Sequence, residues 1–201
     1  MRIDPDSRAL GGFTVFLTFV ALNALYLLCC VPLLTIGAAT SALFTVTIRY
    51  SDDESGRPLK DFFPAMRADF GRATALFLLL ALPATALVAS SVFWFSHDAV
   101  FAGALGLLAV LGALYLFVAF VFAMAQTAWL QASVSRTLKN SLLLPAAEPL
   151  RSMGLLVIPV SVVAIAILFP PFLILVATIG FSVGAYVSAF IFRSVFARRA
   201  T

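Results

Sequence analysis

Long apolar segments alternate with short charged ones along the chain, and this alternation predicts helices that cross a membrane. Apolar runs approaching 20 residues are typical of helices that span a hydrocarbon core of about 30 Å. Six such segments are present, at residues 13–31, 36–48, 73–95, 100–125, 153–169 and 172–192. We therefore expect an all-α, polytopic transmembrane helical bundle of six spans, formed as one domain by residues 1–201.

The first two apolar segments are separated by a short stretch that favours a turn. As one straight helix, residues 13–48 would extend about 54 Å at 1.5 Å per residue, which is too long for the hydrocarbon core. Pro32 removes a backbone donor, and Thr35 and Gly37 are small residues that allow a turn. The sequence thus predicts a helical hairpin whose short second arm needs tilt or a thinner bilayer. The alternative is one kinked element and five spans.

The basic residues predict the orientation of the spans. The connections within the three hairpins hold no Lys or Arg. All 13 basic residues fall in the two terminal segments and in two longer loops, at residues 49–72 and 131–152. The positive-inside rule places both loops and both termini in the cytoplasm, as expected for a multi-pass plasma-membrane protein. Five spans would put Arg2 and Arg8 outside, which violates the rule only mildly.

Composition excludes a water-soluble domain. The chain is 63% hydrophobic and 11% charged, with a mean hydropathy of +1.09. The net charge of +4 needs no nucleic acid, because a basic cytoplasmic face against anionic lipid explains it. The adjacent Cys29 and Cys30 lie inside a predicted span, where small apolar packing is expected rather than redox or metal chemistry. His97, the single histidine, is expected to be a solvated turn residue.

The first cytoplasmic loop contains an amphipathic stretch. Apolar residues recur there at steps of three and four, with charged residues between them, which is the spacing of one helix face. We expect a short cytoplasmic interfacial helix over residues 59–72, bent near Pro64, that lies on the inner leaflet. The alternative is a docking surface for a partner. The candidate contact residues are Leu59, Phe62, Phe63, Met66, Arg67 and Phe70.

The predicted spans lack the side chains that intramembrane chemistry requires. None contains Asp, Glu, Lys, Arg or His, which argues against a proton-coupled carrier and a carboxylate or zinc intramembrane protease. No phosphate-binding glycine loop and no H-E-x-x-H motif is present. We therefore expect no catalytic, metal or cofactor-binding residue, and no enzyme activity. Asn23 and Gln126 are expected to form hydrogen bonds between helices, or alternatively to line a solute pathway.

Small residues mark places where helices can approach closely. Gly180 and Gly184 form a G-x-x-x-G motif in the last span, and Gly103 and Gly106 lie in the fourth. Packing within the bundle is one outcome, and a homo-oligomer is the other.

Residues 32–49 carry a family resemblance. The pattern P-L-x-T-x-G-A-A-T-x-A-L-x-x-V ends just before Arg49, and D-F-F follows at residues 61–63. These motifs resemble the opening of the YesL-like family of bacterial integral membrane proteins. The resemblance covers about the first 75 residues, and the remainder is similar only in hydropathy. It implies a membrane protein of unknown biochemical role, often encoded near carbohydrate uptake systems.

Two functions remain for such a chain. The first is a non-enzymatic accessory or regulatory protein of a solute uptake system, which contacts permease or ATPase subunits through residues 59–72 and 131–152. The alternative is a small transporter or channel component for an uncharged solute, with Asn23, Gln126 and hydroxyl groups along its path. A cavity lined by those residues would favour the transporter. A sealed apolar bundle would favour the accessory protein.

Overall fold

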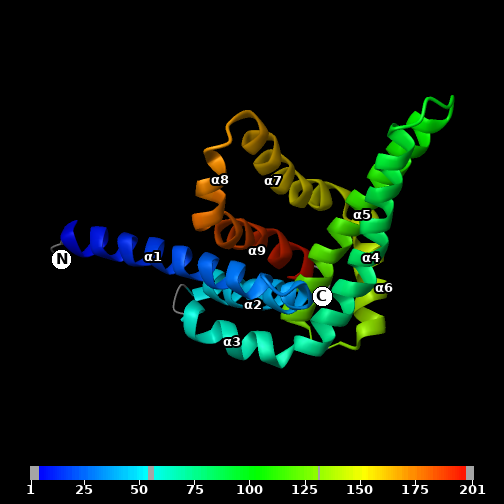
Figure 1. Ribbon diagram of the computed structural model, residues 1–201. Helices are drawn as coiled ribbons and strands as arrows, with labels where there is room; N and C mark the ends of the chain where they lie inside the picture. The colour runs from blue at the N-terminus through cyan, green and yellow to red at the C-terminus, as the bar shows by residue number, and fades with distance from the viewer. Residues whose placement is uncertain (1–4, 54–56, 131, 198–201) are drawn as a thin grey trace.

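The fold is all helical over the residues that the computed structural model describes, 5–53, 57–130 and 132–197 (Figure 1). Within them, six helical segments are long and apolar enough to cross a membrane. The elements are α1 (Pro5–Cys30), the 3₁₀ turn η1 (Leu33–Thr35), α2 (Ile36–Asp53), α3 (Pro58–Ala68), α4 (Phe70–Phe95), α5 (Ala102–Trp129), α6 (Val134–Ala147), α7 (Pro149–Leu168), α8 (Phe172–Leu175), the π-helical segment η2 (Val176–Gly180) and α9 (Phe181–Ala197).

The predicted turn separates α1 from α2, so residues 13–48 form two helices rather than one kinked element, in agreement with the six candidate spans. Helix α1 ends at Cys30, two residues before Pro32, which adopts extended backbone angles. The backbone N–H of Thr35 donates to the carbonyl of Pro32 at 2.9 Å. The Thr35 hydroxyl also hydrogen-bonds to the Cys29 carbonyl, which has no partner within the helix end.

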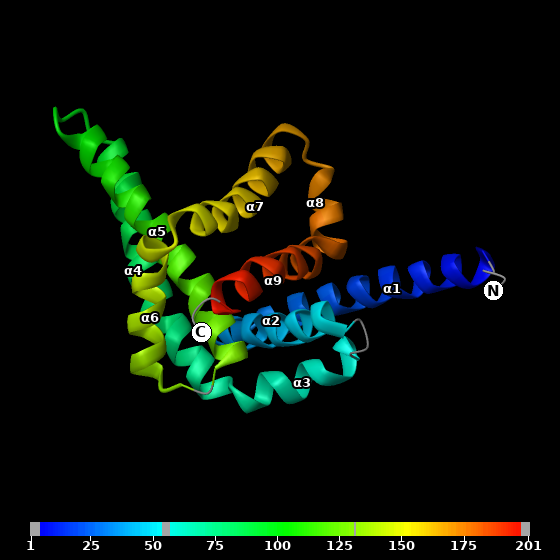
Figure 2. The ribbon, with the colours of Figure 1, turned by 180° about the vertical axis from the view of Figure 1, so that it is seen from behind.

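Helix α2 is the centre of the molecule. Every residue from Ala38 to Ile48 is buried, and α1, α3, α4, α5 and α9 all pack against the helix (Figure 2). It is the least apolar of the six spans and also the most buried. Because other helices surround α2, its short apolar length need not match the hydrocarbon thickness. This arrangement accommodates the short arm that the sequence predicted.

The α4–α5 hairpin crosses the direction of α1, α2 and α9 steeply, so the spans are not parallel (Figures 1 and 2). The two helices pack closely on each other, because a Cβ at Gly106 would stand 2.7 Å from the ring of Phe95. The tip of the hairpin projects away from the other helices. Val100 and Phe101 there are 93% and 74% exposed, which fits surroundings of lipid rather than protein.

The loops between the spans contain the two connecting helices α3 and α6. Helix α3 begins at Pro58, continues through Pro64 and ends at Ala68, so its break falls at Asp69 rather than near Pro64. Pro64 removes the hydrogen bond to the Lys60 carbonyl, but both residues lie on the exposed side of α3, where water can satisfy that carbonyl. In α6, Pro145 likewise lies inside the helix, and the chain breaks only at Glu148. Pro149 then occupies the first turn of α7, where proline is tolerated.

Candidate functional site

Helix α3 divides the predicted contact residues between its two faces. Phe62 is completely buried in the core with Pro58, and Met66 is partly buried against the same core. We define the α3 outer surface as Leu59, Phe63 and the neighbouring Phe70, whose side chains are 38%, 45% and 42% exposed. The inner half of the predicted face therefore packs against the protein's own helices. Only the outer half remains for lipid or a partner.

The direction of α3 follows from its two ends. Helix α2 ends at Asp53, whereas α4 begins near the start of α2, because Ala73 lies against Gly37. Helix α3 must therefore run back along α2, and it also touches α1. Arg57, Lys60 and Arg67 are exposed around the α3 outer surface. The combination of aromatic and basic side chains suits anionic lipid or an acidic partner.

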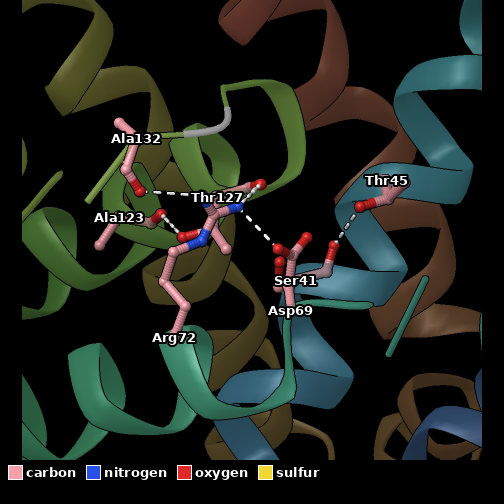
Figure 3. Close-up of polar contacts among 7 residues, drawn as sticks. All are labelled: Ser41, Thr45, Asp69, Arg72, Ala123, Thr127 and Ala132. Atoms are coloured by element: carbon pink, nitrogen blue, oxygen red, sulfur yellow. Dashed lines mark hydrogen bonds and ion pairs between the residues drawn. The ribbon is translucent and has the colours of Figure 1, made fainter. Parts of the chain in front are cut away.

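Arg72 fixes the junction of α3 and α4 to the end of α5 (Figure 3). One terminal nitrogen, Nη2, pairs with the Asp69 carboxylate at 2.7 Å and donates to the Thr127 carbonyl at 2.9 Å. The other, Nη1, donates to the Ala132 carbonyl at 2.9 Å. A cation at the carboxyl end of a helix stabilises the dipole and satisfies the last carbonyls. The contact joins Asp69, the residue that follows α3, to the end of α5.

A second arginine joins the ends of α2 and α9. Arg193 donates from Nη1 to the Ser51 carbonyl at 2.8 Å and pairs through Nη2 with Asp52 at 2.7 Å. Both helices end at this point, so the guanidinium again lies at the carboxyl end of a helix. The sequence analysis assigned Arg72 and Arg193 only to the positive cytoplasmic side. It missed these contacts, because most of the acceptors are distant along the chain from the two arginines. Only Asp69 lies close in sequence to its arginine.

Asn23 links α1 to the π-helical segment. Its amide nitrogen donates to the Ala177 carbonyl at 2.6 Å, and its oxygen accepts from the N–H groups of Phe181 and Ser182 at 2.9 and 3.1 Å. The Ser182 hydroxyl donates in return to the Phe19 carbonyl at 2.9 Å. A π-helical turn changes which backbone N–H groups and carbonyls bond to each other. Asn23 provides a partner for three of the backbone groups at this change. The predicted interhelical role of Asn23 is confirmed.

A cavity of about 430 Å³ lies beside α9. Its wall comes from α1, α2, α5, α7, α8, η2 and α9, and it is almost entirely apolar. The polar lining groups are the hydroxyls of Tyr26, Thr40 and Ser188, of which Tyr26 and Thr40 lie 3.2 Å apart. Neither Asn23 nor Gln126 is part of the lining, although the alternative transporter interpretation placed both along a solute path.

The four predicted packing glycines have different surroundings. A Cβ at Gly103 or Gly184 would meet no atom within 4 Å, and at Gly180 the nearest atom belongs to Val176 of its own segment. Gly180 and Gly184 instead line the cavity, because α7 stands away from α9 at this level. Of these four glycines, only Gly106 lies against another helix of this chain, at the ring of Phe95 on α4. Among the described glycines, a Cβ would come closest to another helix at Gly37, which the sequence analysis placed in the hairpin turn.

The other polar residues that the sequence analysis considered do not converge on one site. Gln126 is buried, and its amide nitrogen has no hydrogen-bond partner among the described residues. His97 lies exposed at the tip of the α4–α5 hairpin, where its Nδ1 is 2.7 Å from the Phe93 carbonyl. Cys29 and Cys30 are free thiols of intermediate exposure. In the described part of the chain, no group of three His, Cys, Asp or Glu side chains is arranged to hold a metal.

Comparison with known proteins identifies a similarity over the first part of the fold. Residues 19–91 match a family described as "Protein of unknown function, DUF624", the same family as the YesL-like proteins. The matched range runs from the middle of α1 through α2 and α3 into α4, and includes Asn23, Gly37 and Arg72. No curated protein and no solved structure matches the chain.

Proposed function

We propose that the chain is a non-enzymatic protein of the bacterial plasma membrane that serves as an accessory or regulatory subunit of a solute uptake system. Carbohydrate uptake is the system we favour, because the YesL-like resemblance implies that context. The observation that carries the proposal is the α3 outer surface. Leu59, Phe63 and Phe70 are held outward by a helix that is itself anchored through Phe62 and Arg72.

An anchored helix is suited to docking because its exposed side chains are already ordered. A flexible loop would lose conformational entropy on binding, whereas α3 has lost most of it on folding. Aromatic residues and arginine also supply much of the binding energy at protein interfaces. Phe63 therefore offers a contact for a permease or ATPase subunit, together with Arg67 one turn further along the same helix.

The experiment compares two neighbouring phenylalanines. Phe63→Ser should leave the thermal stability of the detergent-solubilised protein unchanged and reduce co-purification of uptake subunits at least fivefold. Phe62→Ser should instead unfold the core. Phe101→Ser, the same substitution at an exposed position on the tip of the α4–α5 hairpin, serves as the control that keeps the partners. Co-purification that survives Phe63→Ser contradicts the assigned surface. Gentle purification that yields no uptake subunit contradicts the proposed function itself.

The cavity beside α9 tests the alternative of a small transporter or channel component for an uncharged solute. Its lining argues for an apolar occupant, because it offers only three hydroxyl groups and lacks the amides of Asn23 and Gln126. A sugar would lose most of its hydrogen bonds to water there. We therefore favour the accessory role, and flux of labelled sugar into vesicles that contain only this protein would support the alternative.

A further inference from the structure

We propose that the cavity beside α9 binds one acyl chain of a membrane phospholipid. Three properties of the cavity lead to this occupant: its volume, the state of its hydroxyl groups and the location of its opening. None of them depends on the docking role of α3, so the two proposals stand or fall separately.

The volume distinguishes a hydrocarbon chain from a transmembrane helix. A helix with its side chains is about 10 Å in diameter, so each Å of its length fills about 80 Å³. A helix long enough to cross the membrane would need roughly 2,400 Å³, several times the cavity of about 430 Å³. A helix that crosses a hydrocarbon core of about 30 Å therefore does not fit within this space as a whole, whereas a thin, flexible acyl chain can enter it. The volume also lies within the usual range of small-molecule pockets.

Each hydroxyl group in the wall already donates a hydrogen bond to another group of the protein. Thr40 donates to the Ile36 carbonyl at 2.7 Å, so Tyr26 is the donor in its contact with Thr40. Ser188 donates to the Gly184 carbonyl at 2.8 Å. These groups offer an occupant only acceptor lone pairs, and the rest of the wall is apolar. A polar solute with several donors and acceptors would remain largely unpaired there, while an acyl chain requires no hydrogen bonds.

The opening faces the region where lipid chains are found. Phe117, Val163, Leu173 and Phe181 line the cavity and are each at least 39% exposed, so they form its rim. All four belong to membrane-spanning segments and are uncharged. A chain therefore enters from the hydrocarbon core between α7 and α9 without crossing a polar surface. The phospholipid headgroup remains outside, at the membrane surface.

The sequence keeps this space open in a specific way. Gly180, Gly184 and Ser188 lie one turn apart on the cavity side, where larger side chains would fill the volume. Gly180 also permits the π-helical segment, because a Cβ there would stand 2.9 Å from Val176. Asn23 holds that segment in place from α1. The G-x-x-x-G motif thus makes room for a ligand in this fold, whereas the sequence suggested a contact between helices.

The test uses the purified full chain in vesicles that contain a phosphatidylethanolamine with a photoactivatable diazirine in one acyl chain. Irradiation followed by peptide mass spectrometry should label the rim segments around Val163, Leu173 and Phe181. Gly184→Leu, which projects a side chain into the cavity, should reduce this labelling at least tenfold. Gly103→Leu is the matched control, because its Cβ also meets no atom within 4 Å but lies away from the cavity. Gly103→Leu should be labelled as strongly as the unchanged protein.

Several outcomes would overturn the proposal. Equal labelling of Gly184→Leu and the unchanged protein would show that the chain does not enter the cavity. A shift of Gly184→Leu from dimer to monomer, with no labelled rim in either, would assign the glycines to a second copy of this chain. Native mass spectrometry that finds a retained free fatty acid in place of a phospholipid would exclude the proposed lipid class. The labelling map of the unchanged protein remains informative even if Gly184→Leu fails to fold.

Discussion

Gly37 on α2 lies directly against the backbone of Ala73 on α4. A Cβ at Gly37 would stand 2.5 Å from the Ala73 carbonyl oxygen and 2.6 Å from Cβ of Phe77. Neither neighbour can move aside easily, because one is backbone and the other is the first atom of a packed side chain. The contact brings the start of α4 to the start of α2, and it thereby determines the path of α3 between them.

We predict that Gly37→Ala destabilises the protein by about 1 to 3 kcal/mol, the usual effect of overpacking a tight contact. Thermal unfolding in detergent, followed by the fraction that remains soluble, measures the change. Gly103→Ala is the control, since its Cβ has free space and should alter stability by less than about 0.5 kcal/mol. Equal melting temperatures for the two variants would show that α2 and α4 do not touch at Gly37.

Asn23 should be important for stability through the π-helical segment. We expect Asn23→Ala to lower the free energy of unfolding by about 2 kcal/mol or more, because it leaves Ala177, Phe181 and Ser182 without their partner. Thr18→Ala on the same helix removes only a local hydrogen bond to Thr14 and serves as the control. Stepwise denaturation in SDS measures both. A variant at Asn23 as stable as Thr18→Ala would refute the proposed link.

Arg72 should be irreplaceable at the end of α5. We expect Arg72→Ala to cost about 2 kcal/mol, because three acceptors lose a charged donor. Arg72→Lys should recover less than half of this, because a single ammonium group lacks the fork that reaches all three. Arg67→Ala, at an exposed position on α3, is the control and should remain near the unchanged protein. Proteolysis across residues 60–75 adds a local measurement, in which only the Arg72 variants should become sensitive.

The orientation in the membrane gives a fourth prediction. In a background with Cys29→Ala and Cys30→Ala, a cysteine at Asp98 should react with an impermeant thiol reagent in intact cells. A cysteine at Arg57 should react only after the cells are made permeable. The reverse pattern would place the basic loops outside and contradict the positive-inside assignment. Arg2, Arg198 and Arg199, on which that assignment partly rests, lie outside the described residues.

Local features of the fold could be predicted from the sequence because they depend on local chemistry. Pro32 and Thr35 define the hairpin turn whatever the rest of the chain does, and apolar length alone identifies the six spans. The recurrence of apolar residues at steps of three and four around Phe62 and Phe63 likewise indicated a helix. It could not indicate that one ring enters the core while its neighbour points outward, since that depends on where α2 lies.

Features that depend on how the helices cross could not be predicted. Gly37 and Gly184 are both glycines inside helices, yet one touches the backbone of another helix and the other faces a cavity. Only the steep crossing of α4–α5 and the position of α7 separate the two cases. Arg72 presented the same difficulty, because its acceptors lie at residues 127 and 132. A count of charges in a loop does not reveal such partners.

The central position of α2 has a consequence for biosynthesis. Helix α2 is the second span to leave the ribosome, yet its neighbours include α9, the last of the helices to be made. Until then its buried hydroxyls, such as those of Thr45 and Thr47, must face lipid or the insertion machinery with only their own helix carbonyls as partners. Insertion of α2 therefore depends on α1 as a hairpin partner at first. The native core closes only after translation has reached α9.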